Sequence, residues 1–242
     1  MGLLRDQGVV LMRLDYSETS QIVVFFTREH GKVRTIAKGV KRGTKKRFAV
    51  GIDLLDVGEL VVSARPERSS GLATLTEWKQ VRGFPGLREK LFRVHAAEYL
   101  AETTSQMTEE WDAQPGLFEA LIKALAAFSD ASEPFEVLVG YQWALLECVG
   151  LSPRFDGCVL CGRATELSHF SSHQGGVICR HCEPVQVEKW ELTPTTVSAL
   201  QRRDSSTACR SSFQVLNYHI TQIMGRPTRL AQKLLPPKRL GR

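Results

Sequence analysis

Residues 8–38 read GVVLMRLDYSETSQIVVFFTREHGKVRTIAK. Three segments rich in apolar and β-branched residues, 8–14, 21–27 and 32–38, are separated by DYSETS and REHG, which have the composition of turns. Short segments of this kind, bounded by turn residues, are typical of β-strands. Gly31 can adopt the positive φ that a hairpin turn requires. The stretch therefore predicts three consecutive antiparallel strands.

Two further strands are predicted at 54–64 and 71–81, separated by the turn-rich RPERSS. Five short antiparallel strands favour a small closed barrel, because closure leaves no exposed sheet edge. We therefore expect an N-terminal five-stranded OB-fold β-barrel over residues 1–82. A small sandwich and an SH3-like barrel are the structural alternatives.

The apolar spacing changes to the helical period after residue 82. Ser132 is the expected N-cap of the third helix, and Gly150 is its expected stop. The chain is therefore expected to be a multidomain α+β protein, with an α-helical domain over 83–157 and 183–242 that carries an insert at 158–182. Helices are predicted over 87–101, 117–128 and 135–149, with one or two more over 193–224.

Two Cys-x-x-Cys pairs, CVLCG (158–162) and CRHC (179–182), are separated by seventeen residues. This spacing predicts two turns whose thiolates complete a tetrahedral Zn²⁺ site. A site of four cysteines is closed to water, so its metal is expected to be structural. Four reduced thiols without a metal are one alternative, and replacement of one cysteine by His169, His173 or His181 is another. The predicted ligands are Cys158, Cys161, Cys179 and Cys182.

Residues 32–48 are strongly basic, with eight Lys or Arg among seventeen residues and no acidic residue. Strand alternation predicts that Lys32, Arg34 and Lys38 share one solvent-facing side. The glycine-containing loop that follows would then track a phosphate backbone, with little dependence on base sequence. A solvated loop that only aids solubility is the alternative. The predicted DNA contacts are Lys32, Arg34, Lys38, Lys41, Arg42, Lys45, Lys46 and Arg47.

The composition and motifs narrow the function classes. The chain has 242 residues, 43% of them hydrophobic, and a net charge of +6, which hints at a polyanionic partner. P-loop, G-x-G-x-x-G, H-E-x-x-H, G-x-S-x-G and zinc-deaminase patterns are not found in it. We therefore expect no catalytic residues and no small-molecule substrate. With no apolar run of membrane-spanning length and no signal-peptide pattern, no membrane partner and a cytoplasmic location are expected.

Four blocks of the sequence resemble the RecO family of DNA repair proteins. They are GVVLMRLDYSETSQIVVFFTREHGKVRTIAKGVKR, LFEALIKALAAF, FEVLVGYQWALLECVGLSPRFDGCVLCG and GGVICRHC. The resemblance covers roughly residues 1–185, with the blocks in the family's order. It implies an N-terminal OB-fold, a central helical domain and a zinc-binding insert. The zinc cysteines are absent from some members, and all four are present here.

The resemblance also implies a function and a set of partners. Proteins of this family bind single- and double-stranded DNA and anneal complementary strands without ATP. With RecR they help to load RecA onto DNA coated by SSB, whose C-terminal tail they contact, so a nucleoid-associated location is implied. Two rival classes remain. A zinc-ribbon transcription or translation factor would bind DNA or RNA sequence-selectively, and a zinc-dependent hydrolase or deaminase would need an open metal position.

Overall fold

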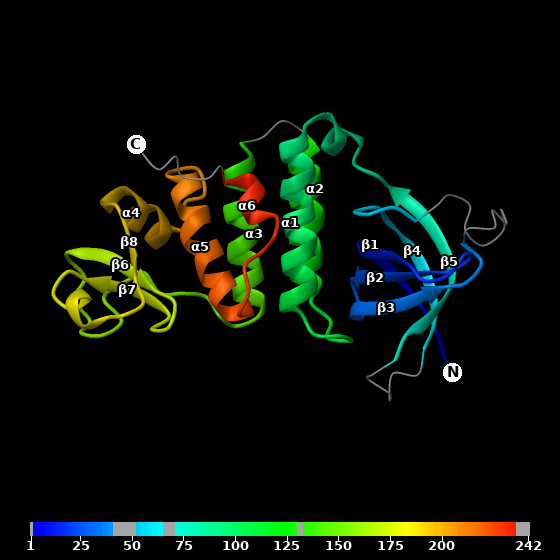
Figure 1. Ribbon diagram of the computed structural model, residues 1–242, viewed down its shortest axis with the longest axis horizontal. Helices are drawn as coiled ribbons and strands as arrows, with labels where there is room; N and C mark the ends of the chain where they lie inside the picture. Colours follow the sequence, from blue (N-terminus) through cyan, green and yellow to red (C-terminus); the bar gives the residue numbers. More distant parts are fainter. Residues whose placement is uncertain (1, 41–51, 65–70, 130–132, 236–242) are drawn as a thin grey trace. The chain divides into compact units, whose positions relative to one another are not determined.

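The computed structural model describes residues 2–40, 52–64, 71–129 and 133–235. The chain divides into two compact units, Met1–Ser129 and Asp130–Arg242. The first contains a β-barrel and two helices, and the second contains further helices and a small sheet (Figure 1). The predicted α+β fold class, with an N-terminal five-stranded barrel and a helical C-terminal part, is confirmed.

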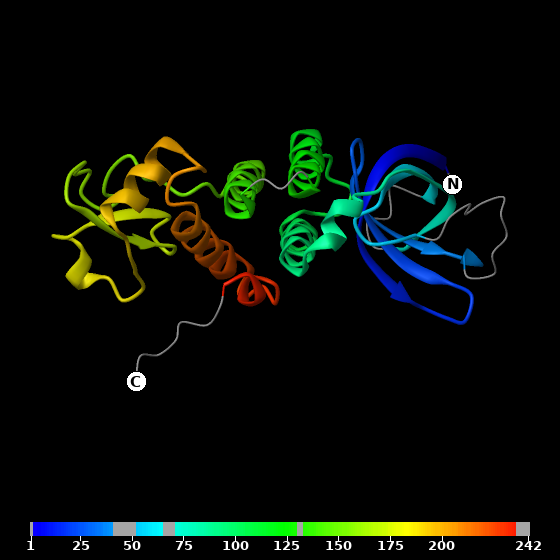
Figure 2. The ribbon, with the colours of Figure 1, turned by 90° about the horizontal axis from the view of Figure 1, so that it is seen from above.

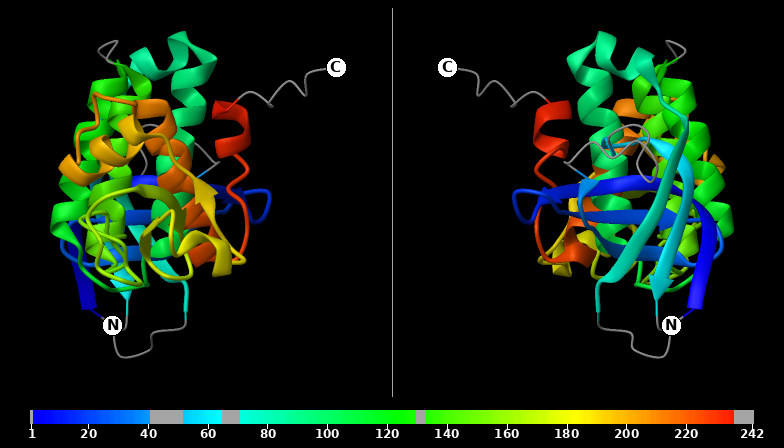
Figure 3. Two further views of the ribbon diagram at one scale, coloured as in Figure 1. Left: turned by 90° about the vertical axis from the view of Figure 1, so that its left-hand side faces the viewer. Right: turned by 90° about the vertical axis from the view of Figure 1, so that its right-hand side faces the viewer.

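The five strands of the first unit close into a barrel in the order β1-β2-β3-β5-β4, with β4 also paired to β1 (Figure 3). This is the order of an OB-fold. One pairing departs from the predicted antiparallel pattern, since β3 runs parallel to β5. The strands are β1 (Gly2–Asp15), β2 (Gln21–Thr27), β3 (Gly31–Ala37), β4 (Val57–Ala64) and β5 (Ala73–Arg82).

Strand β2 is almost completely buried, which explains its continuous apolar run VVFF. Val23 and Phe25 point into the barrel core, where Phe25 lies 5.1 Å from the ring of Trp78. Phe26 points the other way and packs against Phe118 of α2 (Pro115–Ser129), with ring centroids 6.4 Å apart. Both faces of the strand are therefore covered, one by the barrel interior and the other by a helix.

Helix α1 (Leu91–Met107) and α2 lie beside the barrel, and Figure 2 shows both nearly end-on. Helix α1 begins later than predicted because Pro85–Glu89 forms a separate 3₁₀ turn, η2. The buried guanidinium of Arg93 fastens this turn to α1, donating to the carbonyl oxygen of Gly86 at 3.0 Å and to the Glu89 carboxylate at 3.1 Å. These two helices belong to the same compact unit as the barrel. The domain boundaries expected from the sequence, at residues 82, 157 and 182, stay a prediction.

Gly31 permits the close approach of the chain that follows α1. Its φ is +66°, and a Cβ atom built on it would lie 1.8 Å from the backbone oxygen of Asp112. We expect Gly31→Ala to lower the free energy of unfolding by about 2–4 kcal/mol, from left-handed strain plus the clash. Gly39→Ala is the control, because Gly39 has φ +74° but no described atom within 4 Å of its Cβ. Equal losses in denaturant unfolding of the two variants would contradict the role of close approach.

In the second unit, α3 packs on α5, with the rings of Phe135 and Phe213 5.4 Å apart. The N-cap of α3 is Glu133, whose carboxylate accepts from the backbone N–H of Phe135, so the prediction of Ser132 is wrong. Gly150 follows the helix with φ +71°, as expected of a stop. The elements are α3 (Pro134–Cys148), β6 (Leu167–Ser171), β7 (Gly176–Cys179), η3 (Glu183–Val185), β8 (Trp190–Glu191), α4 (Pro194–Arg202), α5 (Cys209–Met224) and α6 (Ala231–Leu234).

In the described part of the chain, no helix has both the length and the apolar character needed to cross a membrane.

Candidate metal centre and nucleic-acid interface

Four cysteine sulfur atoms meet beside the three-stranded sheet β7-β6-β8. The first pair lies on a turn closed by a 2.8 Å hydrogen bond from the N–H of Gly162 to the carbonyl of Cys158. The second pair begins at the end of β7, and the N–H of Cys182 donates to the carbonyl of Cys179 at 3.1 Å. Each turn brings its two thiols to the same side, so the two pairs converge as the spacing predicts.

The geometry of the cluster fits a tetrahedral metal site. All four Sγ atoms lie within 4.8 Å of one another, and those of Cys161 and Cys179 are 3.7 Å apart. Sulfurs bound at 2.3 Å around a tetrahedral ion are separated by about 3.8 Å. The cluster consists of these cysteines, and none of the three neighbouring histidines belongs to it. The four cysteines could therefore hold a metal ion.

The thiols differ in their surroundings. Cys158 and Cys179 are buried together with Ile178, whereas Cys161 is exposed. Burial acts to raise the pKa of the Cys158 thiol, but backbone hydrogen bonds from Cys179 and Cys161 outweigh it and lower the pKa to about 6. Hydrogen bonding to the Cys161 sulfur, together with burial, raises the pKa of Cys182 to about 12. Without a cation, the four thiols share protons through these hydrogen bonds, so one pKa is lowered while another is raised. A bound cation would hold all four sulfurs as thiolates.

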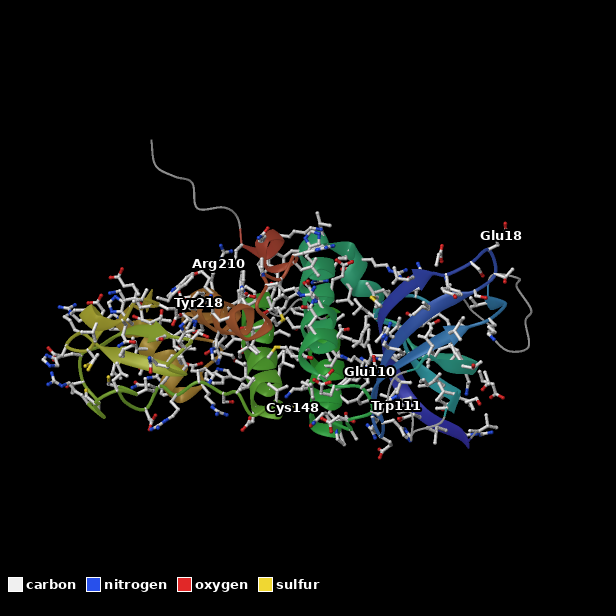
Figure 4. The ribbon with its side chains drawn as sticks, turned by 60° about the horizontal axis from the view of Figure 1, so that its bottom comes forward. Glu18, Glu110, Trp111, Cys148, Arg210 and Tyr218 are labelled. Atoms are coloured by element: carbon white, nitrogen blue, oxygen red, sulfur yellow. The ribbon has the colours of Figure 1, made fainter. Side chains whose placement is uncertain are left out.

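Glu188 ties the small sheet to α5, a contact that the sequence did not reveal. Its carboxylate accepts from the Ser171 hydroxyl at 2.6 Å, from the backbone N–H groups of Ser172 and His173 at 3.1 Å, and from the hydroxyl of Tyr218. Figure 4 labels Tyr218 on α5. Burial acts to raise the pKa of Glu188, but these hydrogen bonds outweigh it and lower the pKa. The carboxylate is therefore held ionised as an anchor for the subdomain that carries the cysteines.

Lys32 is not the solvent-facing residue that strand alternation predicts. Its side chain crosses to the C-terminal end of α1, where Nζ donates to the carbonyl oxygens of Ser105 at 2.6 Å and Thr108 at 2.5 Å. Partial burial lowers the pKa of Lys32, although nearby Glu110 opposes that effect. The ammonium satisfies carbonyls at the negative end of a helix dipole. The solvent-facing part of the prediction is wrong for Lys32, and its contact with DNA stays a prediction.

The other predicted DNA contacts divide into two groups. Arg34 is half-exposed, and its guanidinium lies 3.6 Å from the carboxylate of Glu110. Lys38 is exposed in the turn directly after β3. The remaining five, Lys41, Arg42, Lys45, Lys46 and Arg47, lie outside the described residues, and their role stays a prediction.

Two models of known protein families match this chain. The family model for the Recombination protein O N terminal matches residues 1–84, and the model for the Recombination protein O C terminal matches residues 88–224. The chain belongs to the RecO family. The resemblance drawn from the sequence is thereby confirmed, and the RecO N-terminal match coincides with the closed barrel.

Individual relatives agree with the RecO family match. A DNA repair protein RecO from Bacillus pumilus (strain SAFR-032) is 32% identical over 199 residues, which cover 82% of this chain and 76% of the relative. A DNA repair protein RecO from Bacillus subtilis (strain 168) shows the same identity and coverage. A third, from Bacillus cytotoxicus, is 34% identical over 178 residues, or 73% of this chain and 70% of the relative. Membership of the RecO family supports a role as a mediator of recombination in DNA repair.

Proposed function

We propose that this chain is a recombination mediator that binds DNA and catalyses no reaction. It binds single- and double-stranded DNA, anneals complementary strands without ATP, and with RecR promotes loading of RecA onto SSB-coated single strands. The observation that carries this proposal is the closed OB-type barrel of a RecO-family chain. Its third strand, β3, contains the first residues of the basic stretch, which is residues 32–48. OB barrels commonly bind single-stranded nucleic acid along such a surface.

The proposed mechanism of annealing is electrostatic. Two complementary strands repel each other through their phosphates, and a dense cluster of Lys and Arg lowers that repulsion by replacing condensed counterions. The basic stretch supplies this charge without reading base edges, so binding has little sequence preference. No nucleotide hydrolysis is needed because base pairing itself drives the joining of the strands.

The proposed metal is a structural Zn²⁺ held by Cys158, Cys161, Cys179 and Cys182. Support comes from four convergent sulfurs, because all-thiolate tetrahedral sets are typical of structural zinc. The ion would join the two cysteine turns of a small subdomain that has little apolar core of its own.

The proposed partners are DNA, RecR and the C-terminal tail of SSB, with RecA reached indirectly. These partners, and a cytoplasmic, nucleoid-associated location, are carried over from the family. A zinc-ribbon transcription or translation factor would share the metal site and the basic charge. Such a factor would bind some sequences much more tightly than others. Measuring the affinity of the protein for unrelated oligonucleotides distinguishes the two functions.

Annealing of complementary oligonucleotides, without ATP and at increasing salt, tests the proposal. One strand carries a fluorophore and the other a quencher, and the protein is added to both. We expect faster annealing at low salt, a steep loss of that acceleration as salt rises, and the same behaviour for unrelated sequences. Absence of acceleration at low salt, or acceleration confined to one sequence, would contradict the proposal.

A further inference from the structure

The chain between α1 and α2, residues 108–114, lies along one edge of β3. Within the described residues, β3 pairs with β5 only from Thr35 onward, which leaves the earlier part of that edge open. The connection covers it, because the N–H of Trp111 donates to the carbonyl oxygen of Lys32 at 3.0 Å, and Lys32 forms an isolated parallel bridge with Glu110. Figure 4 labels Glu110 and Trp111 beside the barrel. The connection therefore acts as a short additional strand.

Several features hold this connection in place. Trp111 has φ +64°, an uncommon conformation for a bulky residue, and its side chain packs against the barrel core. Its ring meets that of His30 edge-on at 6.4 Å. The backbone of Asp112 passes so close to Gly31 that a Cβ atom would not fit there. The segment is thus packed as part of the barrel wall.

The connection between α1 and α2 carries acidic residues beside β3, the strand that contains Lys32 and Arg34. Glu109 and Asp112 are exposed, and Glu110 lies between them in the sequence. The Glu110 carboxylate is 3.6 Å from the Arg34 guanidinium, with Arg34 half-exposed and Glu110 about a quarter exposed. Glu110 and Glu109 also favour the charged form of Lys32, against the effect of its burial. A carboxylate oxygen thus already shares the positive charge that Arg34 would offer to a DNA phosphate.

We propose that Glu110 is a built-in competitor for DNA phosphate on Arg34. This inference rests on the proposed DNA binding by β3 and the basic stretch. A phosphate that approaches Arg34 meets a guanidinium whose charge a carboxylate already partly neutralises, so this part of the surface binds DNA weakly. The phosphate path is thereby shifted from Lys32 toward Lys38, in the turn that follows β3.

Glu110→Gln tests the competitor directly, because the amide keeps the size of the side chain and removes its charge. Glu59→Gln is the matched control, since Glu59 is an exposed β4 residue that pairs with Lys79 at 3.5 Å. The measurement is fluorescence anisotropy of a labelled single-stranded oligonucleotide at several salt concentrations. We expect Glu110→Gln to bind about 3- to 10-fold more tightly at low salt, with a log–log salt slope steeper by about 0.7, the value for one added phosphate contact. Glu59→Gln should change affinity by less than about 2-fold.

A double-mutant cycle with Arg34 shows whether the gain arises at the proposed contact. Arg34→Gln should have a small effect in the wild type and should abolish the gain in the Glu110→Gln background. Equal affinity and slope for Glu110→Gln and Glu59→Gln would overturn the inference. If Glu110→Gln lowers the melting temperature, Glu110→Asp is used instead, because it keeps the negative charge but moves the carboxylate away from Arg34. Glu110→Asp should then bind DNA more tightly than the wild type, by less than Glu110→Gln. Affinity of Glu110→Asp equal to that of the wild type would overturn the inference. Failure of the wild type to bind DNA would instead reject the proposed function.

Discussion

Cys158→Ser is expected to abolish the proposed metal binding and to unfold the subdomain that contains β6, β7 and β8. The Cys158 sulfur is buried and shares a small core with Ile178 and Cys179, so no water can replace it as a ligand without disrupting that core. A serine hydroxyl is a poor substitute for a thiolate in an all-sulfur site. The two cysteine turns would then lose the ion that joins them.

The expected effect is large because metal binding is coupled to folding. Structural zinc contributes roughly 10–16 kcal/mol of apparent binding free energy in small zinc domains. Wild-type protein is therefore expected to carry one zinc ion per chain by elemental analysis, and Cys158→Ser none. Loss of the ion should appear as early unfolding in thermal denaturation and as faster proteolysis between β6 and β8. Treatment of the wild type with a strong chelator should reproduce both changes.

Cys209→Ser is the matched control, because Cys209 begins α5 and lies outside the sulfur cluster. It removes one thiol from the chain and should leave one zinc ion bound. Wild-type protein with intact thiols but no metal would contradict the site. So would Cys158→Ser protein that keeps a full equivalent of zinc.

Features set by local sequence patterns were predictable. The strand over residues 21–27 has the predicted bounds because both of its faces are buried, and its apolar residues therefore run without interruption. The two cysteine pairs converge as predicted because each turn is set by the two residues between its cysteines and by nearby glycines. In both cases the pattern that predicts the feature lies within a few consecutive residues.

Contacts between distant segments were not predictable in this way. Alternation correctly placed Lys32 on the outer face of its strand, but the carbonyls that it meets, at Ser105 and Thr108, are more than seventy residues away. Glu110 and Glu188 had no recognisable spacing, since their partners come from other elements. Periodicity tells which face a side chain occupies, whereas the tertiary fold decides what covers that face.

Neutralising the basic stretch after Lys38 is expected to have the second large effect, on DNA affinity. The variant replaces Arg42, Lys45, Lys46 and Arg47 together with glutamine. Loss of four phosphate contacts should flatten the log–log salt slope by about 2.8 for single strands and weaken binding roughly 100-fold or more at low salt. Annealing should slow in proportion, because it uses the same contacts.

A charge-matched control separates local contact from net charge. It replaces four exposed basic residues of the barrel and its helices with glutamine: Arg5, Lys79, Lys90 and Lys123. The log–log salt slope of this control should differ from that of the wild type by no more than about 0.7, the value for one phosphate contact. Lys32 is committed to the end of α1 and Arg34 to Glu110, so less of the binding can come from β3 itself. If the two quadruple variants lose affinity equally, net charge governs binding, and the basic stretch is no specific DNA contact.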